Sequence, residues 1–255
     1  MSRSLSFHAI LGPDGIERDR SVEIGEDGRV VAVRPAGAPH DGFLALPGMP
    51  NAHSHGFQRA LAGFGEAASG EDDSFWSWRE AMYRLAAALD AEDVERIAAQ
   101  AFVEMLRGGF TSVVEFHYLH HRRDGSRGAE AAEAVARAAA RVGLPLVLLP
   151  VYYRRAGFGE ETPGRRQARF AHRDVEEFLR LVESLDGIAA GVAPHSLRAV
   201  APGELADLVE GADRLLGPAC PLHIHVSEQT AEVEECRAAH GTTPIALLAE
   251  HVELG

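Results

Sequence analysis

The stretch from Leu46 to Gly63 reads LPGMPNAHSHGFQRALAG and places His53 and His55 where an apolar run gives way to a turn that contains glycine. Side chains of a β-strand alternate between its two faces, so residues two positions apart point the same way. Two imidazoles at this spacing can converge on one metal ion, but they are also compatible with two partly exposed loop histidines. The remainder of the sequence has to decide between these interpretations.

Strands and helices alternate regularly on the C-terminal side of this stretch, which is typical of parallel β/α units. The predicted strands are apolar along their length, as expected when both faces of a sheet are buried. A closed (β/α)8 barrel needs eight such units, so the five present predict either an open sheet or the front part of a longer TIM-like barrel. The predicted strands lie at 43–53, 110–117, 144–153, 187–195 and 220–228, and helices at 74–88, 90–107, 128–143, 175–182, 202–212 and 230–241.

The residues before this region form a different pattern. SFHAILG, SVEIG and RVVAVRP are short apolar or alternating runs, and Glu26-Asp27-Gly28 predicts a tight turn between the last two. We therefore expect a small antiparallel, β-sandwich-like domain at 1–46 and a metal-dependent hydrolase barrel at 47–255.

Composition argues against several classes of partner. The formal charge of −13 argues against nucleic acid and anionic membranes as main partners, because both select a basic surface. The N-terminus lacks the apolar core of a signal peptide, and no run approaches the length of a membrane-spanning helix. Only Cys220 and Cys236 are present, which is typical of free thiols in a reducing cytoplasm.

A second histidine pair occurs in PLHIHVSEQ, where His223 and His225 share one face of a predicted strand and Glu228 follows on the loop. A metal ligand followed by a carboxylate makes a hydrolytic pair, because the metal lowers the pKa of water and the carboxylate moves the proton. His223 can instead be a core histidine, and Glu228 an acid favoured by the dipole of the next helix.

Histidines gather at the C-terminal ends of the predicted strands. Besides the two pairs, PHS at 194–196 and EFHYLHH at 115–121 lie at strand ends, and a parallel barrel brings such ends to one rim. The other five histidines are scattered, and we expect surface or packing roles for them: His8, His40, His172, His240 and His251.

These motifs resemble a known family. PGMPNAHSH is similar to the first-strand metal motif of the amidohydrolase superfamily, and HVSE to its fifth-strand ligand and catalytic glutamate. More narrowly, NAHSHGFQRALAG, FWSWREAMYRLA, TSVVEFHYLHH, APHSLRAV and PLHIHVSEQTAEVEEC together resemble the formimidoylglutamate deiminase family along nearly the whole chain.

The resemblance implies a mononuclear Zn²⁺ held by His53, His55 and His225, with Glu228 as the proton shuttle. Fe and Mn also suit such ligands. It further implies substrate contacts from five residues, of which the arginines can grip carboxylates bidentately while the others hydrogen-bond. These residues are Gln58, Arg79, Tyr118, His195 and Arg198.

The implied reaction is hydrolysis of N-formimino-L-glutamate, a dicarboxylate amidine, to N-formyl-L-glutamate and ammonia during histidine degradation. The family also implies a homodimer, and a further metal-site histidine and aspartate from strands beyond residue 255, so we expect the 255-residue chain alone to be inactive. Two alternatives remain: a deaminase of guanine or another purine, against which the two arginines argue, and a non-catalytic metal-binding module.

Overall fold

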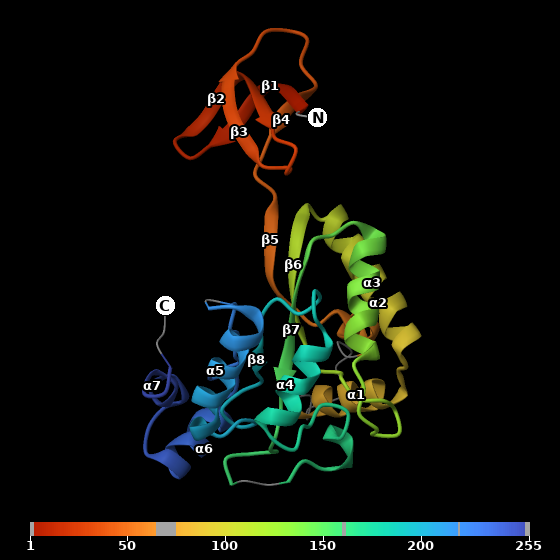
Figure 1. The fold of residues 1–255 in the computed structure, drawn as a ribbon, viewed down its shortest axis with the longest axis vertical. Helices are drawn as coiled ribbons and strands as arrows, with labels where there is room; N and C mark the ends of the chain where they lie inside the picture. Colours follow the sequence, from red (N-terminus) through yellow and green to blue (C-terminus); the bar gives the residue numbers. More distant parts are fainter. Residues whose placement is uncertain (1–2, 65–74, 160–161, 219, 253–255) are drawn as a thin grey trace. The chain divides into compact units, whose positions relative to one another are not determined.

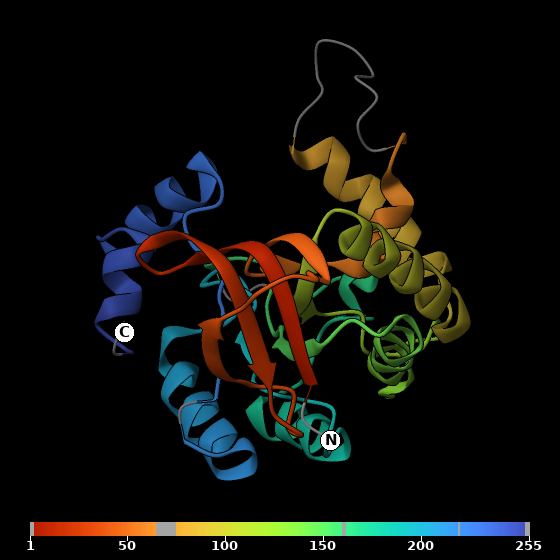
Figure 2. The same ribbon diagram turned by 90° about the horizontal axis from the view of Figure 1, so that it is seen from above.

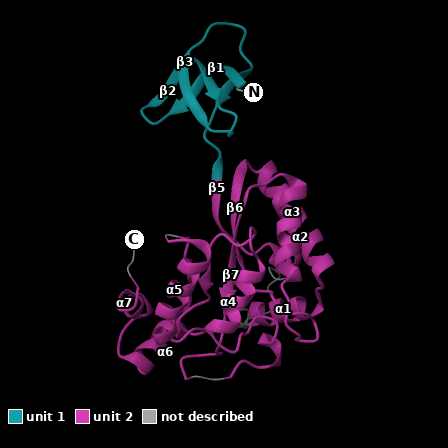
Figure 3. Cartoon of the chain, in the orientation of Figure 1, with its two compact units in different colours: residues 1–49 teal, residues 50–255 magenta. Residues whose placement is uncertain are grey.

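The computed structural model describes residues 3–64, 75–159, 162–218 and 220–252. The chain forms two compact units, Met1–Met49 and Pro50–Gly255, drawn in teal and magenta in Figure 3. This division falls three residues beyond the domain boundary predicted at residue 46.

The first unit is a sheet with the strand order β3-β2-β1-β4. Its strands are β1 (Arg3–Gly12), β2 (Gly15–Ile24), β3 (Val30–Pro35) and β4 (Gly42–Ala45). The first three pair antiparallel, as predicted, whereas β4 runs parallel to β1.

The strand predicted at 43–53 is wrong as a single element. It divides into β4 and β5 (Met49–Ser54), which belong to different sheets. Pro47 and Gly48 lie between them: proline donates no ladder hydrogen bond, and glycine packs no side chain on the sheet. The apolar character of the run concealed this break.

The second unit has a sheet with the order β5-β6-β7-β8, which includes β6 (Phe110–His117), β7 (Leu146–Tyr152) and β8 (Ala193–Pro194). Strands β6, β7 and β8, labelled in Figure 1, pair in parallel. The predicted strand at 220–228 is reduced to two parallel bridges, Val192 with Leu222 and Ser196 with His225. A Cβ at Gly191 would lie 2.2 Å from the Pro221 carbonyl oxygen, so this close approach requires glycine.

Helices surround these strands in sequence order, as the view from above shows (Figure 2). Asp90 caps its helix through a reciprocal capping box with Asp93, confirming the predicted start. A short helix at 244–249 was not predicted. The helices are α1 (Phe75–Ala88), α2 (Ala91–Arg107), α3 (Glu130–Val142), α4 (Val175–Ser184), α5 (Leu205–Leu216), α6 (Thr230–His240) and α7 (Pro244–Ala249), with 3-10 turns η1 (Gly56–Leu61), η2 (Arg165–Gln167) and η3 (Pro202–Glu204).

Two apolar clusters hold the second unit together. One includes Phe102, Val113 and Leu148, and the other includes Phe178 and Leu208. Both cysteines are free, as predicted. Among the described residues, no helix combines the length and apolar character needed to cross a membrane.

Candidate active site

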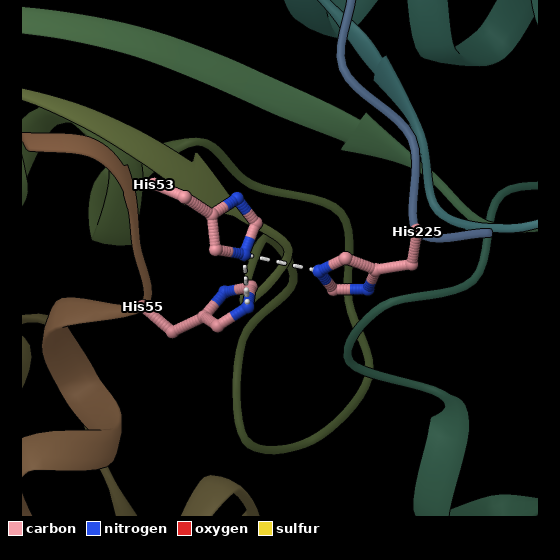
Figure 4. Close-up of side chains that lie close together, drawn as sticks. All are labelled: His53, His55 and His225. Carbon is pink, nitrogen blue, oxygen red and sulfur yellow. Dashed lines mark hydrogen bonds between the residues drawn. The ribbon is translucent and has the colours of Figure 1, made fainter. Parts of the chain in front are cut away.

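Three histidine side chains meet beyond the C-terminal end of β5 (Figure 4). His53 lies on β5 and His55 one residue past it, while His225 comes from the segment that bridges to Ser196. His53 Nε2 lies 3.1 Å from His55 Nε2 and 3.1 Å from His225 Nε2. Residues 172 positions apart in the sequence therefore present their ring nitrogens to one point.

Backbone hydrogen bonds fix the ring of His55 and the main chain at His225. His55 Nδ1 lies 2.9 Å from the Phe116 carbonyl oxygen, so this nitrogen carries the donated proton and Nε2 keeps its lone pair. The backbone N–H of His225 donates to the His195 carbonyl at 3.0 Å. Burial lowers the pKa of His55 to about 3 and that of His225 to about 4, so both rings are neutral at pH 7. Neutral imidazole is the form that ligates metals.

The donor set fits a divalent cation. One ligand atom from each of His53, His55 and His225 lies within 4.8 Å of the other two. Three lone-pair nitrogens packed together repel one another unless a proton or a cation lies between them. Imidazole donors suit Zn²⁺ and also Fe or Mn.

Glu228 lies just past His225. Its carboxylate accepts a hydrogen bond from Arg198 Nη2 at 3.1 Å, and its side chain is 34% exposed. Burial raises the pKa of Glu228, whereas the Arg198 guanidinium opposes that rise. Buried Glu232 fixes the loop, because its carboxylate accepts from the backbone N–H groups of Ser227 and Glu228 at 3.3 and 2.9 Å. A carboxylate in this setting can exchange protons with a reacting group.

A cavity of about 120 Å³ collects the predicted substrate-binding residues. His55, His225 and Glu228 line it, whereas His53 lines a second hollow that also includes His225 and Glu228. The predicted substrate residues in the cavity wall are Gln58, Arg79, Tyr118, His195 and Arg198.

Polar contacts position several of these side chains. Gln58 Nε2 donates to the Tyr118 hydroxyl, and burial raises the pKa of Tyr118, which keeps that hydroxyl protonated. The Arg79 guanidinium lies over the Tyr83 ring, with its carbon 5.7 Å from the centroid. Arg198 is only 13% exposed. The cavity therefore presents two cationic groups beside neutral hydrogen-bonding groups.

The aromatic part of the cavity wall was not predicted. Trp78, Tyr83, Tyr153 and Phe170 line it together with Met82. They come from α1 and the segments after β7, and a helical apolar face that lines a cavity has the same periodicity as one that packs in a core.

Glu115 was also missed as a positioning residue. It is fully buried on β6, and its carboxylate accepts the backbone N–H of Gly56 at 2.6 Å, next to His55. Burial raises its pKa to about 7. The available signal was an acidic residue between the apolar residues Val114 and Phe116 of the strand FTSVVEFH.

The three histidines of 115–121 lie at the C-terminal end of β6 and just after it, as predicted. His117, His120 and His121 are buried. Their Nε2 atoms each lie 3.0 Å from a carbonyl oxygen, that of Leu119, Val151 and Ala171, respectively. These contacts hold the loops after the strands in place, and none of the three side chains lines the cavity. Side chains at the end of a strand alternate in direction, so only some of them face the cavity.

Family comparison agrees with this geometry. The model of the amidohydrolase family matches residues 44–252. The chain belongs to the amidohydrolase family. This confirms the family predicted from the motifs, and with it the α/β fold of the TIM-barrel type, of which the curled parallel sheet and its helices form part.

Individual relatives sharpen the comparison. Formimidoylglutamate deiminase of Pseudomonas aeruginosa is 44% identical over 99% of this chain, which covers 57% of that relative. The 5-methylthioadenosine/S-adenosylhomocysteine deaminase of Natronomonas pharaonis is 29% identical over 86% of this chain, which covers 47% of it. The chain therefore spans about half the length of the curated relatives it matches.

Solved structures give the same result. The crystal structure of an amidohydrolase from Brucella melitensis has a TM-score of 0.87 and 40% identity, and the match covers 99% of this chain and 58% of that one. Atrazine chlorohydrolase from Arthrobacter aurescens TC1, solved in complex with zinc, has a TM-score of 0.73 at 18% identity, covering 97% and 57%. The second likeness concerns the fold alone.

Proposed function

We propose that the whole protein hydrolyses the C=N group of N-formimino-L-glutamate, releasing ammonia and N-formyl-L-glutamate. The observation that carries this proposal is the meeting of Arg79, Arg198 and Glu228 in one cavity beside the histidine cluster. A dicarboxylate needs two cationic contacts, and an amidine needs an acid–base group. The identity of 44% to a formimidoylglutamate deiminase supports the same substrate class.

His53, His55 and His225 are the residues that would hold the metal, for which we propose Zn²⁺. When bound, the ion supplies a Lewis acid that lowers the pKa of water and polarises the C=N group. A further histidine and an aspartate from the rest of the protein are proposed to complete the site.

Each residue of the cavity has a distinct proposed task. Arg198 and Arg79 bind the two carboxylates of the substrate, and the linked pair of Gln58 and Tyr118 orients the formimino group. Glu228 removes a proton from the attacking water and delivers it to the departing nitrogen. Water adds across the C=N bond, the C–N bond breaks, and ammonia leaves. His195, whose ring centroid lies 5.2 Å from that of His225, supports the substrate as a neutral group, because burial lowers its pKa well below the usual value.

The test measures ammonia release from N-formimino-L-glutamate by the purified whole protein. We expect release that a chelator abolishes and that added Zn²⁺ restores. Glu228→Gln should lower kcat by about 10²–10⁴-fold, the range typical of a lost general acid–base group. Glu235→Gln, which removes an exposed carboxylate from α6, is the matched control and should leave the rate unchanged.

Other outcomes separate the alternatives. Release that is indifferent to both chelator and Glu228→Gln would refute the proposal. Guanine and other purines, assayed side by side, should not be deaminated, because two arginines suit carboxylates better than a flat base. Metal binding without any hydrolysis would indicate a non-catalytic module. A cytoplasmic homodimer acting in histidine degradation completes the proposal.

A further inference from the structure

A second cluster of metal-ligating side chains lies in the first unit. It consists of His8 on β1, Asp19 on β2 and His40 in the connection before β4, and one ligand atom of each lies within 4.8 Å of the other two. Phe7 pairs with Arg20 and Ala9 with Arg18, so His8 and Asp19 stand opposite each other on neighbouring strands. Sequence analysis gave the two histidines only surface or packing roles.

Local contacts bring His40 to the strand pair. The neighbouring Asp41 exchanges two hydrogen bonds with Ser6 of β1, both at 2.7 Å, which fixes this connection on the sheet. The rings of His40 and His8 then stack with centroids 3.9 Å apart. Asp19 adopts a φ of 49°, in the left-handed region that L residues rarely adopt, although Asp tolerates it better than most.

The contact between His40 and Asp19 is not an ordinary hydrogen bond. His40 Nε2 lies 3.2 Å from Asp19 Oδ1, and the His40 side chain is only 8% exposed. Nevertheless this buried nitrogen has no hydrogen-bond partner in the described structure, because the oxygen lies out of line with the ring N–H. In a tetrahedral Zn²⁺ site with metal–ligand distances of about 2.0–2.2 Å, two ligand atoms lie roughly 3.3 Å apart. The distance between His40 Nε2 and Asp19 Oδ1 is close to this value.

We propose that His8, Asp19 and His40 bind a divalent first-row transition-metal ion, with Zn²⁺ as the best match to two imidazoles and one carboxylate. The ion fastens β1, β2 and the connection before β4 to one another, and water completes its coordination. These ligands are distinct from the histidines of the proposed active site. The competing explanation is a salt bridge between protonated His40 and Asp19, which needs no metal.

The test counts metal ions bound to the purified whole protein. After metal depletion and dialysis against Zn²⁺, we expect Asp19→Asn and His40→Gln each to bind one ion per chain fewer than the parent, with ammonia release retained. Asp14→Asn, which removes a carboxylate from the turn between β1 and β2, is the matched control and should keep the full number. Co²⁺, used in place of Zn²⁺, should give a visible absorption band whose intensity corresponds to the same number of bound ions per chain.

A second background separates this site from the active site. In a His55→Asn protein, one ion per chain should remain, and adding His40→Gln should remove it. Zn²⁺ should also raise the melting temperature of His55→Asn by several degrees, but not that of the double variant. Equal metal content of the His55→Asn and double variants, or of the parent and His40→Gln, would overturn the proposal in favour of the salt bridge.

Discussion

Arg198 lies between the cavity proposed to hold the substrate and Glu228, the proposed proton shuttle. Its guanidinium lines the cavity and donates to Glu228 at 3.1 Å. Because that cation opposes the burial-driven rise of the Glu228 pKa, its removal should let the pKa rise further. One residue therefore couples substrate binding to the pH dependence of the reaction.

Arg198→Gln should lower kcat/KM for N-formimino-L-glutamate by about 30-fold to several thousandfold, since loss of one partner of a desolvated charge pair costs about 2–5 kcal/mol. KM should rise, and the acid limb of the profile of kcat/KM against pH should move to higher pH, where Glu228 now loses its proton. Arg180→Gln, which breaks an exposed pair on α4, is the control. An unmoved acid limb would show that Glu228 does not set it.

Glu115 stabilises the folded protein more at low pH than at high pH, whereas most carboxylates do the reverse. Its folded-state pKa is about 7 against an ordinary 4.5, so between these values the folded protein keeps a proton that the unfolded chain releases. The contribution of Glu115 to the free energy of unfolding therefore falls as pH rises from 4.5 to 7 and levels off above.

Glu115→Gln cannot ionise and should lose this pH dependence. Relative to the parent, the variant should gain up to about 3 kcal/mol between pH 5 and pH 8, because one pKa unit corresponds to about 1.4 kcal/mol. Denaturant unfolding at several pH values measures it, with Glu133→Gln on α3 as the control. A pH-independent difference between variant and parent would contradict the raised pKa.

The site could be predicted at the level of residues wherever spacing carries the information. Two histidines two positions apart in an extended segment can point the same way, and the structure has His53 Nε2 and His55 Nε2 3.1 Å apart. The roles of Glu115 and of the aromatic residues Tyr153 and Phe170 were not predicted, because each depends on contacts with residues that are distant in the sequence. The roles of the predicted site residues themselves stay predictions until variants are measured.

At the scale of elements, helix starts were predictable because capping is local. Asp90 accepts the Asp93 N–H at 2.9 Å and receives the reciprocal bond at 3.2 Å, all within four residues. Strand boundaries could not be predicted, because they depend on which strands pair. One apolar run is divided into β4 and β5, which lie in different sheets. The run at 220–228 pairs only through two isolated bridges. A short-range pattern cannot report a long-range ladder.

The cap of α2 provides a test at this scale. Asp90→Ala should lower the free energy of unfolding, because it removes the N-cap of α2. Asp90→Asn still accepts the Asp93 N–H and should cost only a few tenths of that. Thermal unfolding compares the three proteins, and equal losses for Ala and Asn would show that the negative charge, not the cap, matters.

At the scale of the whole molecule, apolar surface concentrates on the first unit. Val30, Val31 and Val33 of β3 are 61%, 63% and 46% exposed, and β3 is an edge of the sheet in the described part of the chain. An exposed apolar edge strand is a template for pairing with another chain. The 255-residue chain produced alone should therefore self-associate.

Replacing Val31 and Val33 together with lysine should weaken this association, because charges on an edge strand block edge-to-edge pairing. Sedimentation velocity over a range of concentrations measures the effect on the 255-residue chain. Ile245→Lys, at a site on α7 that is 54% exposed, is the control and should leave association unchanged. In the whole protein, the same double substitution should instead lower the melting temperature if further residues cover this edge. Association that is equal in the parent and the double variant would place the responsible surface elsewhere.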